Sequence, residues 1–455
     1  MSVGITTFGL FFLLIVSIWM FFWSKHLIPL LIFSSIFQAA SIYNFNSFAV
    51  VPYYLVSIIV LCKFLLILVM SGGKIYFANK NLKYIMIALF VFLIWAMVSA
   101  ITLPFIFEGM PIFSPKDGID EQYIYQATLL WSTSNVAQAI YLFLNIFNVI
   151  ALMQYISNEK NKNIALNSFL ITIYIAIFMI LYHSLSKFIQ IPFPEDFLYS
   201  NSFYSQGFEQ RVGNLFRANG TFSEPSLAGT YIAGIACSFF AYRINNNTLF
   251  QQFLLFSISF LALVVTTATT GYMTFFIMIC IILIMNFLNI YRFKLKKTTL
   301  VMMVLFLFLI GVTFIVVVNS NLLSSVESLT TSKGESDSFK HRIFSDLFSI
   351  NIFFESYGLG VGLGSNRPSS YITSILSNLG IIGAGVMFYI VFMITKQVFK
   401  HRQNNEIKFF FLIFISTLVS QMLSIPDITM PFFWLNLGCL FAYLNYYSIN
   451  IIYEK

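Results

Sequence analysis

Charged residues are scarce in this chain. They make up 9% of its 455 residues, whereas a soluble protein carries roughly 25%. A water-soluble domain needs a polar shell around its core, and a chain that is 59% hydrophobic cannot supply one. The shortage of charge therefore excludes a soluble enzyme, an intrinsically disordered chain and a nucleic-acid-binding protein.

Cysteine and histidine are also rare, with four of each. The cysteines, Cys62, Cys237, Cys280 and Cys439, all lie in apolar stretches, so we expect neither a disulfide framework nor a metal-binding cysteine pair. The histidines are too few and too scattered for a metal cluster. We therefore expect no metal and no cofactor. The apolar stretches also lack the series of Asp, Glu and His residues that ion-coupled transporters use.

Long apolar stretches dominate the chain. A membrane helix needs about 20 mostly apolar residues, and the sequence predicts about 12–14 transmembrane helices. The predicted spans are 4–23, 28–43, 50–70, 84–107, 135–156, 164–186, 225–242, 249–267, 271–290, 299–319, 370–395, 408–424 and 430–449. The first stretch is predicted to be a retained span because it lacks the basic segment and cleavage site of a signal peptide. With no internal repeat and no added soluble domain, residues 1–455 are predicted to form one all-α polytopic transmembrane domain.

The net charge of +8 reports mainly on orientation in the membrane, because cytoplasmic loops are enriched in Lys and Arg. Most of the basic residues lie in one set of loops: Lys25, Lys74, Lys80, Lys83, Lys160, Lys162, Arg243, Arg292, Lys294, Lys296, Lys297, Lys396, Lys400, Arg402, Lys408 and Lys455. Only Glu159, Glu406 and Glu454 accompany them. These loops are predicted to be cytoplasmic, with the N-terminus outside and the C-terminus inside. The basic balance implies no nucleic-acid partner.

Three long segments lie on the opposite side, at 108–134, 187–224 and 320–369. Long loops are uncommon and are usually functional. The cytoplasmic loops, by contrast, are short and basic. We therefore expect the functional surface on the external side, where the outer leaflet meets water.

Segment 187–224 combines many aromatic residues with Arg211 and Arg217, and it ends where a span begins. The Ser-Glu-Pro sequence at 223–225 can cap that helix. A helix N-terminus beside two arginines attracts phosphate. The alternatives are that the arginines pair with nearby glutamates or touch lipid headgroups. The aromatic residues are either interfacial anchors or platforms on which sugars stack.

Segment 320–369 contains a Ser/Thr-rich stretch and a predicted amphipathic helix over 339–355. Its apolar face holds Phe339, Ile343, Phe344, Leu347, Phe348 and Ile350, and its polar face holds His341, Arg342, Ser345, Asp346 and Ser349. Such a helix can lie in the membrane interface and present His341 and Arg342 to water. Arg342 and Asp346 are four residues apart and can pair. The alternative is an ordinary surface helix with a solvated polar face.

A glycine-rich segment, Gly358–Gly364, follows this helix. Its spacing and its position after a helix exclude a dinucleotide-binding fingerprint. We expect a turn that returns the chain to the membrane. The alternative is a loop whose backbone N–H groups bind an anion.

These residues suit glycosyl transfer from a lipid-diphosphate-linked sugar at the outer leaflet. The donor arrives in the membrane, so its enzyme must lie there too. The leaving diphosphate gains negative charge, which fixed arginines stabilise without a metal because guanidinium stays charged and binds phosphate bidentately. The acceptor hydroxyl needs a general base, for which His341, Asp346 and Glu224 are the candidates.

Two external segments and a later span carry motifs that resemble one family. The motifs are Arg217-Ala-Asn-Gly-Thr-Phe-Ser-Glu-Pro-Ser-Leu-Ala-Gly229, His341-Arg342 followed by Gly358-Leu-Gly-Val-Gly-Leu-Gly364, and Asn378-Leu-Gly-Ile-Ile-Gly383. Together with the many-span layout, they resemble the O-antigen and capsular-polysaccharide polymerases (Wzy-type) and the related O-antigen ligases. The layout covers most of the chain and is more specific than any single motif.

The resemblance implies a bacterial inner-membrane glycosyltransferase with a GT-C-like helical fold and an active site facing the periplasm. Its donor and acceptor would be undecaprenyl-diphosphate-linked glycans, and it would need no metal or nucleotide sugar. Its partners would be the lipid bilayer and a possible chain-length regulator protein. Matching the family's loops would make Arg211 and Arg217 key residues of the first loop, and His341 or Arg342 of the second.

Within this family we favour a repeat-unit polymerase. One alternative is an O-antigen ligase, which transfers glycan to lipid A-core. An alternative from another class is a flippase or transporter of lipid-linked glycan, which would predict cations facing a central cavity and a two-fold internal repeat.

Overall fold

The computed structural model describes residues 4–45, 48–70, 72, 76–113, 126–202, 210–212, 215–244, 247–290 and 337–453. Its helices are α1 (Thr7–Trp23), α2 (Leu27–Ser34), α3 (Pro52–Met70), α4 (Lys80–Ile106), α5 (Thr133–Tyr155), α6 (Glu159–Ile189), α7 (Glu195–Leu198), α8 (Pro225–Ala241), α9 (Leu249–Val265), α10 (Thr269–Ile290), α13 (Asp337–Glu355), α14 (Tyr371–Lys400), α15 (Asn405–Ser424) and α16 (Pro431–Tyr453). Its short strands are β1 (Gly4–Ile5), β2 (Tyr43–Asn44), β3 (Ala49–Val50), β4 (Pro111–Phe113), β5 (Gln126–Thr128), β6 (Arg211–Val212) and β7 (Leu215–Phe216). Strands β1, β2 and β3 form one antiparallel sheet, while β4 pairs with β5 and β6 with β7.

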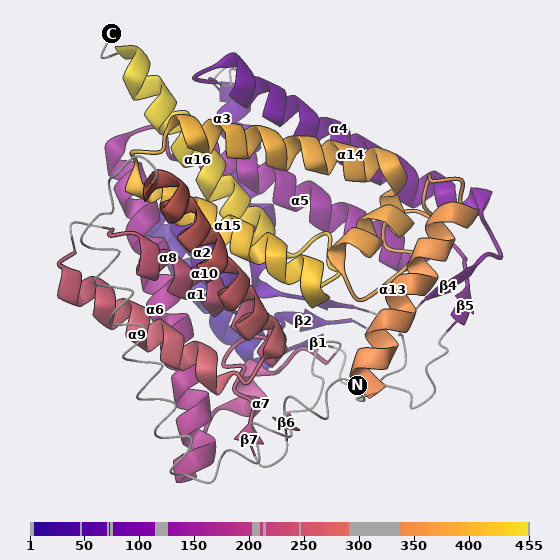
Figure 1. Ribbon diagram of the computed structural model, residues 1–455, viewed down its shortest axis with the longest axis horizontal. Coiled ribbons are helices and arrows are strands. Elements are labelled where there is room, and N and C mark those ends of the chain that lie inside the picture. The colour runs from indigo at the N-terminus through magenta and orange to yellow at the C-terminus, as the bar shows by residue number, and fades with distance from the viewer. Residues whose placement is uncertain are drawn as a thin grey trace.

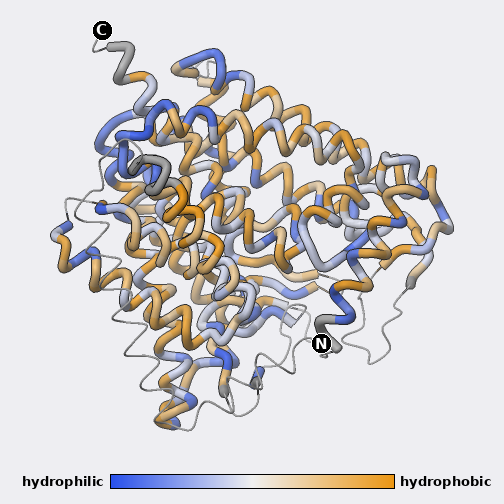
Figure 2. The backbone as a smooth tube through the Cα atoms, in the orientation of Figure 1, coloured by the Kyte–Doolittle hydropathy of each residue, from blue (hydrophilic) through white to orange (hydrophobic). Residues whose placement is uncertain are grey.

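The described chain is mostly helical, and six of its helices are long and apolar enough to cross a membrane: α3, α4, α5, α6, α14 and α15. In an apolar 18-residue stretch of each of these helices, only between 33% and 67% of the residues are buried. Many apolar side chains therefore face outward. Figure 2 shows apolar residues along most helices and hydrophilic residues gathered near their ends. Apolar surface of this extent favours lipid over water as its surroundings. Helix length and composition thus agree with the predicted multi-pass membrane protein.

The predicted spans that lie in described residues are helical, with one exception. The prediction of a span at 28–43 is wrong, because α2 is only 8 residues long and the chain continues without helix to β2. An 8-residue helix rises about 12 Å, whereas the apolar layer of a membrane is roughly 30 Å thick. The extended part is held by backbone hydrogen bonds: Ala39 N–H donates to Thr221 O at 3.1 Å, and Asn201 N–H donates to Ala39 O at 3.1 Å. The predicted span 299–319 lies outside the described residues.

The helix bundle has two different ends. Figure 1 shows the short strands at the end opposite the C-terminus, which we call the strand-bearing end. At the other end, the basic end, α5, α8 and α14 finish and α6, α9 and α15 begin. Its basic residues include Lys162, whose Nζ lies 3.4 Å from Glu406 Oε2. The described parts of the segments predicted to be cytoplasmic thus gather at the basic end, and the described parts of the segments predicted to be external gather at the strand-bearing end.

Helix α8 lies inside the bundle, with nearly all of its side chains buried. It packs closely on α10 and α15 through small residues. A Cβ atom on Gly229 would lie 2.9 Å from Ala268 Cβ, and one on Gly234 would lie 3.1 Å from Ser416 Cβ. Small residues let helices approach closely where lipid removes the hydrophobic driving force. This packing fixes the first turn of α8 at the strand-bearing end.

Helix α14 is interrupted at Gly380, which has φ 64° and ψ −164°. The glycine-rich segment packs into this break: Gly362 N–H donates to Asn378 O, and Ile381 N–H donates to Gly358 O, both at 2.9 Å. A Cβ atom on Gly380 would collide with the Gly358 carbonyl, so the close approach requires glycine. The segment therefore returns the chain to the bundle, as predicted. Its engaged N–H groups do not support the anion-binding alternative.

Candidate active site at the strand-bearing end

Helix α13 lies against α14 and begins two residues before the predicted start (Figure 1). Part of its apolar face turns outward, with Ile343 46% and Leu347 59% exposed, while Phe348 packs against a small buried cluster that includes Ile112 and Leu129. The expectation that its polar face turns to water is wrong in part, since Ser345 and Ser349 are buried. Their hydroxyls donate to the carbonyls of Arg342 (2.9 Å) and Ser345 (2.7 Å) within the same helix. Next to lipid, apolar side chains can face outward while small polar ones pack inside.

Arg217 follows strand β7 and is half-buried. Its backbone N–H donates to Gln210 O (3.0 Å), and its Nη1 donates to Gln210 Oε1 (3.2 Å). The next residue, Ala218, donates its N–H to Val265 O (3.1 Å) at the end of α9. Gly220 has φ 59° and sits against α6, too close for a side chain. The backbone on either side of Arg217 is therefore fixed, and this holds the guanidinium at the bundle end.

The Arg217 guanidinium has spare binding capacity. Its buried Nε has no hydrogen-bond partner among the described residues. Loss of hydration lowers the pKa of Arg217; the Glu224 carboxylate opposes this shift, and the positive charge of Arg342 adds to it. Arginine nonetheless stays charged at neutral pH. A cation that has lost water and faces a second cation is stabilised by an anionic ligand.

Glu224 stands at the N-cap of α8, with Pro225 in the first turn, as the sequence predicted. Its side chain makes no capping hydrogen bond, and its Oε2 accepts from Ser226 Oγ at 2.8 Å. The described residues contain no Arg217–Glu224 ion pair, so the two groups interact only at longer range. The positive end of the α8 dipole adds to the attraction for an anion here.

Helix α13 brings Arg342 within electrostatic range of Arg217 and sets the neighbouring His341 against β4. Arg342 is exposed and close enough to lower the pKa of Arg217. His341 is half-buried, and its ring packs edge-to-face on Phe113 of β4 with the centroids 5.1 Å apart. Burial lowers the pKa of His341, and the charge of Arg342 lowers it further. The imidazole is therefore neutral near pH 7 and able to accept a proton.

The other two predicted site residues have different surroundings. Arg211 is exposed on β6. Asp346 Oδ1 accepts hydrogen bonds from the N–H groups of 369–370 (2.9 and 3.0 Å) and from the Thr373 hydroxyl (2.8 Å). Its carboxylate thus holds the start of α14, and the described residues contain no Arg342–Asp346 ion pair. Asp346 therefore has no part in the chemistry we propose.

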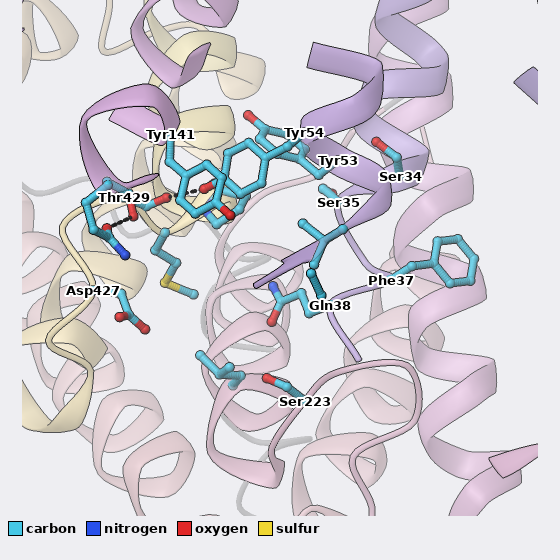
Figure 3. A pocket seen from close by; sticks show the side chains of 16 residues that line it. Ser34, Ser35, Phe37, Gln38, Tyr53, Tyr54, Tyr141, Ser223, Asp427 and Thr429 are labelled. Carbon is cyan, nitrogen blue, oxygen red and sulfur yellow. Dashed lines mark hydrogen bonds between the residues drawn. The ribbon is translucent and has the colours of Figure 1, made fainter. Parts of the chain in front are cut away.

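A pocket of about 90 Å³ lies beside the first turn of α8. Its walls come from α2 and the chain after it, the starts of α3 and α16, α5, and the turn between α15 and α16. The lining residues are Ser34, Ser35, Phe37, Gln38, Ala49, Val51, Tyr53, Tyr54, Gln138, Tyr141, Ser223, Leu227, Asp427, Thr429, Met430 and Pro431. Figure 3 shows the Gln38 amide and the Asp427 carboxylate directed toward the same space.

Sequence reasoning missed this pocket and its acid. Asp427 Oδ1 lies 3.3 Å from Arg367 Nη2, and the Thr429 hydroxyl donates to Gln138 Oε1 at 2.6 Å. No spacing could reveal these neighbours, because they come from segments far apart in the chain. The one available signal was an acidic residue, Asp427, in a short turn between two predicted spans.

Within the described residues, no group of three or more His, Cys, Asp and Glu side chains could hold a metal ion. The chain matches no protein-family model and no curated protein. Its function must therefore be argued from its own residues.

Proposed function

We propose that this protein is a membrane glycosyltransferase that polymerises undecaprenyl-diphosphate-linked oligosaccharide repeat units into O-antigen or capsular polysaccharide. It would act at the outer face of the bacterial inner membrane, with a GT-C-like fold and the strand-bearing end toward the periplasm. The observation that supports this most is the half-buried Arg217. Its Nε has no hydrogen-bond partner among the described residues, and the charges of Glu224 and Arg342 both affect its pKa. The motif resemblance supports the choice of reaction.

The two arginines bind the diphosphate of the donor. As the bond between the anomeric carbon and the diphosphate oxygen breaks, the leaving group takes the electron pair and its negative charge grows. Arg217 and Arg342 stabilise this charge without a metal, because preorganised cations in a site poor in water need little rearrangement. Glu224 stabilises the positive charge that develops on the donor sugar.

The acceptor is a sugar hydroxyl of the next repeat unit. Its oxygen forms the new bond to the anomeric carbon, and its proton passes to neutral His341, which later releases it to water. The lowered pKa of His341 keeps the base unprotonated at neutral pH. The products are a glycan longer by one repeat unit and a free lipid diphosphate.

Deleting the gene tests this proposal. If the protein is a polymerase, lipid A-core in the deletion strain should carry a single repeat unit. A gel of surface polysaccharide should then show one band in place of a ladder. Loss of all O-antigen, with polymer left on the lipid carrier, would indicate a ligase. Single repeat units retained on the cytoplasmic side would indicate a flippase, and an unchanged ladder would contradict all three activities.

A further inference from the structure

The pocket beside α8 has a rigid aromatic wall. The rings of Tyr54 and Tyr141 stack with their centroids 4.0 Å apart and their planes 10° apart. The Tyr54 hydroxyl donates to Thr429 O (3.0 Å), and Asn145 Nδ2 donates to the same carbonyl (2.9 Å). The Tyr54 ring is thus tied to the turn before α16, which reduces the conformational freedom that a ligand would have to remove.

Polar groups face this wall with hydrogen-bonding capacity left over. The described residues offer no hydrogen-bond partner to the Gln38 amide or the Ser223 hydroxyl. Asp427 shares one oxygen with Arg367, and a carboxylate has further acceptor sites. The pocket therefore presents donors, acceptors and one negative charge around an aromatic surface.

This combination selects among ligands. A purely apolar ligand would leave Asp427, Gln38 and Ser223 without partners, which is costly in a confined site. A phosphate would meet the Asp427 carboxylate. The lining contains no Lys or Arg, and Arg367, which lies 3.3 Å from Asp427, already pairs with that carboxylate. A pyranose ring fits both features, because its hydroxyls bind carboxylates and amides while its C–H face packs on an aromatic ring.

The pocket is also placed for a reaction. Ser223 and Leu227 line it, and they flank Glu224 at the start of α8. On the basis of the proposed function, we infer that this pocket is a sugar-binding subsite that holds one pyranose of the acceptor glycan, with Tyr141 as its platform and Asp427 as its hydroxyl-binding group. The diphosphate of the donor then lies on the Arg217 side of Glu224.

Binding of sugar without diphosphate tests this inference independently of catalysis. The probes are a panel of free monosaccharides (glucose, galactose, N-acetylglucosamine, rhamnose and glucuronic acid), and the measurement is saturation-transfer NMR on the purified protein in detergent. At least one sugar should bind the wild type. Tyr141→Ala and Asp427→Asn should each weaken that binding by about tenfold, the loss expected when a hydrogen bond to a charged group or a packed ring is removed.

Two control variants separate the sugar site from its surroundings. Arg367→Gln removes the ion pair but keeps the Asp427 carboxylate, so it should bind the sugar like the wild type; a loss equal to that of Asp427→Asn would mean that only the ion pair matters and would overturn the inference. Arg217→Ala should also bind normally, even though it should lose polymerisation. No binding by any sugar, or binding that Tyr141→Ala and Asp427→Asn leave unchanged, would overturn the sugar subsite and leave the diphosphate site untouched.

Discussion

The two ends of the bundle differ in whether their buried cation has a partner. At the basic end the buried cation is paired: Lys162 lies 3.4 Å from Glu406, and the Tyr447 hydroxyl donates to Glu406 Oε2 at 2.7 Å. The buried atoms there without a hydrogen-bond partner among the described residues, Gln252 Oε1 and Gln397 Nε2, belong to neutral amides. At the strand-bearing end the half-buried Arg217 has no ion pair among the described residues, and its Nε has no hydrogen-bond partner among them. Buried polar groups normally find partners inside the protein, so this contrast indicates where a ligand completes the structure.

The largest effect should come from removing Arg217, the half-buried cation that has no ion pair among the described residues. Arg217→Ala should reduce polymerisation by about 100- to 1,000-fold, the usual loss when one preorganised group that stabilises transition-state charge is removed. Ladder formation in cells carrying the variant checks this. The matched control is Arg402→Ala, an exposed arginine at the basic end, which should leave the ladder unchanged. Equal losses in both variants would remove the distinction between the two ends.

The proposed base predicts a dependence on pH. Because burial and Arg342 lower the pKa of His341, activity should fall only as the pH drops below about 6.5, when the imidazole gains a proton and can no longer accept one. His341→Gln should lower the rate of polymerisation by about 100-fold and abolish the fall in activity at acidic pH. Arg342→Gln removes a charge that lowers the pKa of His341, so the fall in activity should begin at a higher pH. A wild-type pH profile in His341→Gln would exclude His341 as the base.

The glycine contacts at the strand-bearing end should matter for stability. Gly380→Ala forces a side chain into a left-handed backbone against the Gly358 carbonyl and should destabilise the protein by about 2 kcal/mol. Gly385 lies in the same helix with open space around it, so Gly385→Ala should be neutral or stabilise by up to about 1 kcal/mol. Thermal unfolding in detergent compares them. Similar transition temperatures would show that the break in α14 tolerates a side chain.

The smallest effect should come from Arg211. This arginine is exposed on β6, where a charge contributes about 1 kcal/mol or less, so Arg211→Ala should lower polymerisation by about fivefold at most. The same ladder assay measures it. A complete loss would place Arg211 in the site and require the β6–β7 hairpin to close over the ligand.

The helical layout was largely predictable from the sequence, because a run of apolar residues of sufficient length has one common structure in a membrane. The failure at 28–43 shows the limit of that rule. Composition alone does not distinguish a buried extended chain from a buried helix. There the chain turns from α2 into backbone bonds with Thr221 and Asn201, which are more than 150 residues away.

The candidate site was predictable only in its motif residues. Arg217 and Glu224 stand next to a recognisable helix start, and α13 brings Arg342 within electrostatic range of Arg217. The environment of Asp346 was not predictable, because its partners at 369–370 belong to the next helix. Nor was the buried face of α13, since hydrophobic periodicity assumes that the polar side of a helix meets water.

The most direct test is polymerisation by the purified protein in liposomes, with single lipid-linked repeat units extracted from the deletion strain as the only substrate. We expect the wild type to convert them into a ladder in the presence of EDTA, and Arg217→Ala to leave them as single units. Failure of the wild type to elongate the units, or equal ladders from both proteins, would contradict the proposed glycosyl transfer at the strand-bearing end.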